Sequence, residues 1–75
     1  LAQEINTWDP MSCADYNTEI GSLQSKLYPR IDAATLGQLI SDTFRESFGT
    51  RSFRCSLEEC NAVAQRILSR AVIGA

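Results

Sequence analysis

The chain has 75 residues and a formal net charge of -2, from nine acidic and seven basic side chains. This length suits one small domain, residues 1–75. The charge balance argues against a nucleic-acid-binding protein, and no apolar segment approaches the ~20 residues of a membrane-spanning helix. There is no histidine, the commonest general base and metal ligand. We therefore expect no metal and no other cofactor.

Residues 1–11 are expected to form an extended leader. Asp9-Pro10 disfavours helix directly before the proline, because the proline ring restricts the preceding residue. Trp8 has the largest apolar area of this segment, and it can either fold back over the core or contact a partner.

A first helix is expected over residues 12–28. Ser12 is a candidate N-cap, with Asp15 three residues later as the capping acid. Tyr28-Pro29 should end the helix. Its inward stripe has helical spacing and comprises Cys13, Tyr16, Ile20, Leu23 and Leu27.

A second helix is expected over residues 32–48. Asp32 is its candidate N-cap, and Gly49 stands where a left-handed C-terminal residue belongs. The inward face comprises Leu36, Leu39, Ile40, Thr43, Phe44 and Phe48.

A third helix is expected over residues 56–73, where Ser56 and Glu59 form a capping box. Its apolar face comprises Leu57, Cys60, Ala64, Ile67, Leu68 and Ala71. Three helices with short connections predict an all-α three-helix bundle with antiparallel neighbours. The first and third helices would then be parallel and would bring all three cysteines to one end.

Three cysteines in so short a chain favour an oxidising compartment, so we expect a periplasmic or secreted protein. Two disulfides compete. Cys13–Cys60 would close a ~48-residue loop and stabilise the fold by about 4 kcal/mol, and we favour it. Cys55–Cys60 is a local alternative, and a fully reduced chain stays open as a third possibility.

The sequence lacks a glycine-rich phosphate loop, a nucleophile elbow and a catalytic cysteine with a base, so we expect a non-enzymatic protein. Arginines and aromatic residues gather between residues 45 and 54, a combination that favours a protein partner. The candidate partner-binding residues are Trp8, Phe48, Arg51, Phe53 and Arg54.

The run from Trp8 to Tyr16, WDPMSCADY, resembles the start of the HdeA/HdeB family of periplasmic acid-stress chaperones. Their first helix opens with Thr/Ser-Cys, an acid and an aromatic residue. Cys60 stands at a family-like distance from Cys13, whereas Cys55 is extra. The resemblance implies an exported helical homodimer, held by one disulfide, that loosens in strong acid and holds unfolding clients.

Three functions follow as hypotheses. The first is an exported, disulfide-linked protein that binds other proteins, as an acid-stress chaperone does. The second is a dedicated inhibitor or immunity-type partner of one enzyme or toxin, recognised through residues 45–54. The third is a structural subunit or trimmed domain of a larger assembly, with Trp8, Phe48 and Phe53 in the interface.

Overall fold

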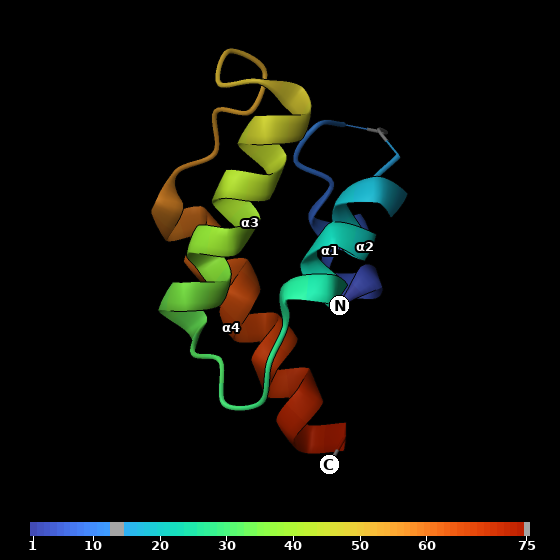
Figure 1. Ribbon diagram of the computed structural model, residues 1–75, viewed down its shortest axis with the longest axis vertical. Helices are drawn as coiled ribbons and strands as arrows, with labels where there is room; N and C mark the ends of the chain where they lie inside the picture. Colours follow the sequence, from blue (N-terminus) through green and yellow to red (C-terminus); the bar gives the residue numbers. More distant parts are fainter. Residues whose placement is uncertain (13–14, 75) are drawn as a thin grey trace.

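The computed structural model describes residues 1–12 and 15–74, and these form four helices (Figure 1). The helices are α1 (Ala2–Trp8), α2 (Asn17–Lys26), α3 (Ala33–Phe48) and α4 (Leu57–Gly74). α4 packs against α3 and α1, and α2 packs against α3. The protein is all-α as expected, but the predicted three-helix bundle is wrong because the N-terminal segment adds a helix. No helix in the described part of the chain is long and apolar enough to cross a membrane.

The predicted extended leader is instead helix α1. Ile5 is fully buried, and Leu1 and Trp8 pack against the core from the same face, at the i, i+4 and i+7 spacing of a helix. The prediction failed because it weighed Trp8 alone and overlooked this spacing. α1 ends at Asp9, whose backbone is left-handed with φ 44° and whose amide donates to the Ile5 carbonyl at 3.0 Å.

Helix α2 is shorter than the predicted helix 12–28, and it begins five residues later. Ser12 has a left-handed backbone with φ 57°, which is not the extended conformation of an N-cap residue. The predicted cap at Ser12 is therefore wrong. The Asp15 carboxylate instead accepts a hydrogen bond from the Asn17 amide at 2.9 Å.

A tyrosine organises the connector before α2. The Tyr16 hydroxyl donates to the Asp9 carboxylate at 2.6 Å and accepts from the Met11 amide at 2.9 Å. Because Tyr16 is buried, these bonds fix the path of the chain between α1 and α2.

Helices α3 and α4 begin where the capping rules predict. The Asp32 carboxylate accepts from the Thr35 amide at 2.7 Å, and the Ser56 hydroxyl accepts from the Glu59 amide at 3.1 Å. α3 ends at Gly49, whose φ of 84° favours glycine.

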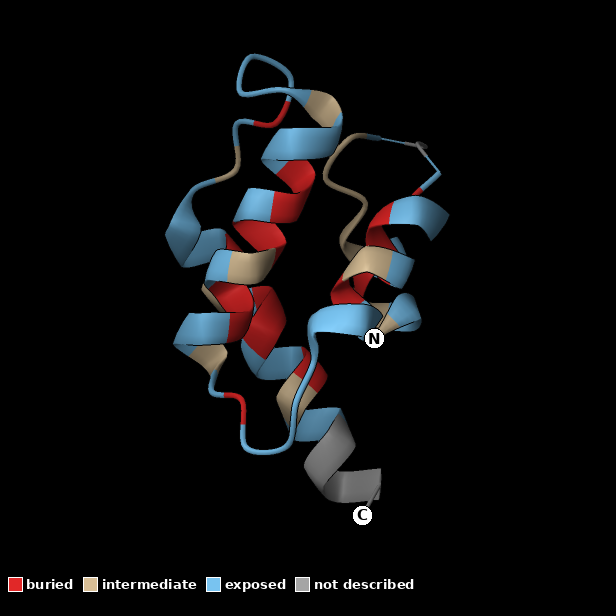
Figure 2. Ribbon diagram, viewed as in Figure 1, coloured by how far each residue is buried: buried red, intermediate tan, exposed pale blue. Residues whose placement is uncertain are grey.

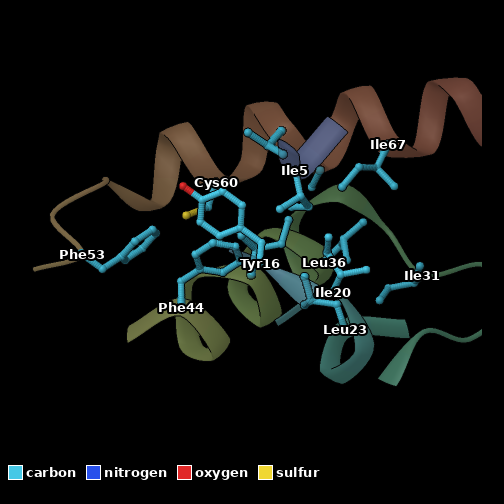
Figure 3. Packing of buried hydrophobic residues seen from close by; sticks show 13 residues of the cluster. Ile5, Tyr16, Ile20, Leu23, Ile31, Leu36, Phe44, Phe53, Cys60 and Ile67 are labelled. Carbon is cyan, nitrogen blue, oxygen red and sulfur yellow. The ribbon is translucent and has the colours of Figure 1, made fainter. Parts of the chain in front are cut away.

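The buried side chains form one cluster between the four helices, on their inward faces (Figure 2). Phe44 is fully buried at its centre, beside Tyr16 (Figure 3). The ring centroids of four aromatic neighbours lie 5.3–5.9 Å from that of Phe44, within the usual range for ring pairs. These neighbours are Phe53 (5.3 Å), Trp8 (5.5 Å), Tyr16 (5.7 Å) and Phe48 (5.9 Å).

Small residues bring α3 and α4 close together. A methyl group built on Gly37 would lie 2.9 Å from the Asn61 Cα, so only glycine fits there without a shift of the backbone. Ser41 of α3 and the α4 residues Cys60 and Ala64 are also buried. The α3–α4 interface is therefore closely packed at Gly37.

The predicted disulfide is wrong. Cys55 and Cys60 are free thiols, so neither Cys13–Cys60 nor Cys55–Cys60 is formed; Cys13 itself lies outside the described residues. Cys60 is buried against α3 and packs as a small apolar side chain. The periplasmic interpretation relied on cysteines that form disulfides, and the chaperone interpretation relied in part on the Cys13–Cys60 pair, so both lose that support.

Candidate functional site

One candidate site lies at the end of α3, in the connector 49–56 and at the start of α4. We call Arg45, Arg51, Arg54 and Leu57 the arginine tip. All four side chains are exposed, Leu57 to 42%. Leu57 was expected on the apolar inward face, but in the first turn of α4 it faces solvent. The tip thus combines guanidinium groups with one exposed apolar side chain.

The connector that carries the tip is anchored by Phe53. This ring is 2% exposed and packs edge-on against Trp8, with 6.0 Å between ring centroids. The Phe53 amide donates to the Gly49 carbonyl at 2.9 Å, and Arg54 Nε donates to the Arg51 carbonyl at 3.0 Å. The backbone between Gly49 and Arg54 is therefore fixed by contacts of its own.

The arginines of the tip have no carboxylate partner among the described residues. The ion pairs of the described residues lie elsewhere, where Glu4 contacts Arg70 and the Leu1 amino group. Arg45, Arg51 and Arg54 therefore keep their guanidinium groups available to solvent or to a partner.

The predicted partner-binding residues separate into two groups. Arg51 and Arg54 are exposed in the tip, whereas Phe53 is buried and Trp8 and Phe48 are partly buried in the aromatic cluster. The indole of Trp8 also donates to Glu59 at 2.7 Å. The aromatic residues thus shape the core beneath the tip, and the arginines form its surface.

The described cysteines are poorly suited to nucleophilic chemistry. Burial, aided by a hydrogen bond with Glu59, raises the pKa of the Cys55 thiol to about 12. Burial also raises the pKa of Cys60. Both stay protonated near neutral pH, and a protonated thiol is a poor nucleophile. Within residues 1–12 and 15–70, no three His, Cys, Asp or Glu side chains gather to hold a metal ion.

A second site is a groove between α1 and α4, with a volume of about 640 Å³. Polar side chains dominate its walls, namely Gln3 and Thr7 of α1 and Gln65, Arg66, Ser69 and Arg70 of α4. This groove was not predicted from the sequence, because residues 1–11 were expected to be extended and form α1 instead. The available signal was the recurrence of polar residues on α4, opposite its apolar face.

The groove has one anchored arginine and one free arginine. Arg70 Nε contacts a Glu4 carboxylate oxygen at 2.8 Å, and Arg70 Nη2 donates to Gln3 Oε1 at 3.0 Å. The other Glu4 oxygen contacts the Leu1 amino group at 2.8 Å. Hydrogen bonding from that amino group, with the charge of Arg70, lowers the pKa of Glu4. Arg66 has no hydrogen bond or ion pair among the described residues.

Comparison with known families matches residues 1–72 to the model of DUF1871, a domain of unknown function. Comparisons with curated proteins and with solved structures give no match. Because the match spans nearly the whole chain, this protein belongs to the DUF1871 family.

Proposed function

We propose that this chain is a non-enzymatic protein-binding domain that recognises an acidic surface of one protein partner through the arginine tip. The observation that carries the proposal is a set of exposed arginines without a carboxylate partner among the described residues, one at the end of α3 and two on the anchored connector. Arginine presents a planar fork of N–H donors that suits carboxylate groups, so these side chains favour an acidic partner.

Anchoring of the connector supports recognition of a defined partner. Binding costs less when the contact residues are already ordered, and Phe53 orders the backbone from beneath. A fixed arrangement of charges also discriminates among partners, because misplaced like charges repel. The tip therefore favours a dedicated partner, of the inhibitor or immunity type, over broad binding of unfolded clients.

Leu57 adds an apolar contact to the charged rim. Interfaces commonly combine a small apolar centre with a polar surround. Leu57 is 42% exposed and follows Arg54 by three residues, so a partner that pairs with the arginines can cover it as well.

Quantitative affinity capture from the native cells tests this proposal. The protein is compared with Arg51→Glu/Arg54→Glu and with a matched control, Lys26→Glu/Arg30→Glu, which makes the same charge change at the end of α2 and in the connector to α3. We expect one stoichiometric partner with the wild type and the control. In reconstituted binding the tip variant should lose about 100-fold in affinity, since like charges then face each other.

Either of two results would reject the proposal: no stoichiometric partner at all, or a purified partner that binds the tip variant as tightly as the wild type. The dependence of the binding affinity on salt concentration is a second test of the proposal. Affinity for the wild type should fall between about 0.05 M and 0.5 M salt, because exposed charge pairs are screened.

A further inference from the structure

We propose that the groove between α1 and α4 binds an oxyanion group, a carboxylate or a phosphate, of a small molecule. Along α4 the groove begins at Ala62, after the last residue of the arginine tip, Leu57, so this inference does not depend on the protein-binding role. It comes from the balance of hydrogen-bond donors and acceptors along the walls.

Arg66 is an exposed arginine of the groove wall, and its guanidinium has no partner among the described residues. A guanidinium is always charged and offers two parallel N–H donors to a carboxylate or phosphate. Among the described residues that line the groove, Arg66 is therefore a positively charged side chain that is free to bind a ligand.

Arg70 lines the same groove, one turn further along α4. Its contacts with Glu4 at 2.8 Å and with Gln3 at 3.0 Å hold the side chain against α1. These contacts use Arg70 Nε and Nη2, so the other terminal nitrogen keeps its N–H donors for a ligand. The groove thus has a positioned arginine beside a free one.

The main hydrogen-bond acceptors on the α1 side of the groove already have partners. Glu4 is the carboxylate among the described lining residues, its side chain is 7% exposed, and both of its oxygens already have partners. Gln3 uses its oxygen to accept from Arg70, which leaves its NH₂ group as a donor. A ligand therefore meets mainly donors, from the two arginines, the glutamine amides and the hydroxyls of Thr7 and Ser69.

The groove has the volume of a small-molecule site. A volume of about 640 Å³ lies within the range of small-molecule sites, roughly 300–1,000 Å³. The methyl group of Ala62 and the aliphatic stems of Gln65 and Arg66 provide apolar contact for the rest of the ligand. These features fit a compact molecule that bears one or more oxyanion groups.

NMR titration of the full ¹⁵N-labelled chain tests the inference, with citrate as the carboxylate probe and inorganic phosphate as the phosphate probe. Ionic strength is held near 0.15 M so that screening stays constant. We expect saturable shifts at the amides of Gln3, Thr7, Gln65 and Ser69 with at least one probe. Saturation by citrate alone identifies a carboxylate site, and saturation by phosphate alone a phosphate site.

Two variants give the control. Arg66→Gln should weaken binding at least 10-fold, whereas Lys26→Gln, which removes one positive charge at the end of α2, outside the groove, should leave it within twofold. Both side chains are exposed, and an unchanged amide spectrum without ligand shows that each variant is folded. Shifts that stay linear with both probes, or that are equal in Arg66→Gln and wild type, would overturn the proposal.

Discussion

The two sides of α4 differ sharply. Toward α3 the helix presents Cys60, Val63, Ala64 and Ile67, all buried, and the two backbones approach closely at Gly37. Toward α1 it presents Gln65, Arg66 and Ser69, all exposed, across an open groove. One helix thus closes the core on one side and leaves polar groups uncovered on the other.

This difference separates the stability of the fold from its capacity to bind. Burial of apolar area and close packing stabilise the α3 side. The seven-residue α1 is too short to be a stable helix alone, and it is held mainly by Ile5 and Trp8. Substitutions on the α3 side should therefore change the free energy of unfolding, and substitutions in the groove should not.

The largest contrast is expected between Phe44→Ala and Arg66→Ala. Phe44 is fully buried among four aromatic rings, and its truncation should cost about 3–5 kcal/mol of unfolding free energy. Arg66 is exposed and unpaired, so its truncation should change that free energy by less than about 0.5 kcal/mol. Urea unfolding followed by circular dichroism measures both. Similar losses for the two variants would remove the distinction between the faces.

A smaller contrast is expected between two glycines. Gly37→Ala should destabilise the fold by about 1–3 kcal/mol, because the new methyl group meets the Asn61 backbone at 2.9 Å. Gly21→Ala is the matched control in α2, with nothing within 4 Å of the added methyl group. It should stabilise the fold by about 0.5–1 kcal/mol through helix propensity. Thermal unfolding of both variants measures these changes in stability. A Gly37→Ala variant as stable as the wild type would disprove the close α3–α4 contact.

The smallest expected effect is the pH dependence of the α3 cap. Hydrogen bonds from Thr35, through its side chain and its backbone amide, lower the pKa of Asp32. The ionised carboxylate therefore stabilises the fold above the unfolded value of about 4, and this contribution is lost as pH falls through the lower folded value. Asp32→Asn keeps a capping side chain but does not titrate. The stability difference between wild type and Asp32→Asn should be larger at pH 6 than at pH 3, and a difference constant with pH would contradict this.

Local rules predicted the parts of the fold that depend on local chemistry. The caps at Asp32 and Ser56 and the terminal glycine at position 49 are found where the sequence indicated them. The same rules failed at Ser12, because the Tyr16 hydroxyl binds Asp9 and Met11 and diverts the chain before α2. Hydrogen bonds between residues a few positions apart thus overrode a plausible capping box there.

The candidate sites were predictable only in part. The arginines of the tip were visible as a cluster in sequence, but the burial of Phe53 depends on Trp8 and Phe44, which are distant in the chain. The groove needs α1 to lie beside α4, a contact between residues about sixty positions apart. The predicted disulfide relied on an expected helix that included residue 13, whereas α2 begins at Asn17.

Native-state hydrogen exchange tests the division of α4 most directly. We predict that the buried α3 and α4 amides, such as those of Ile40, Phe44 and Ala64, exchange only through global unfolding. The amides of Ile5 and Asp9, which close the turns of α1, should exchange through a local opening of lower free energy. Equal protection of α1 and α3 would show that the groove wall is as stable as the core, and would contradict the account.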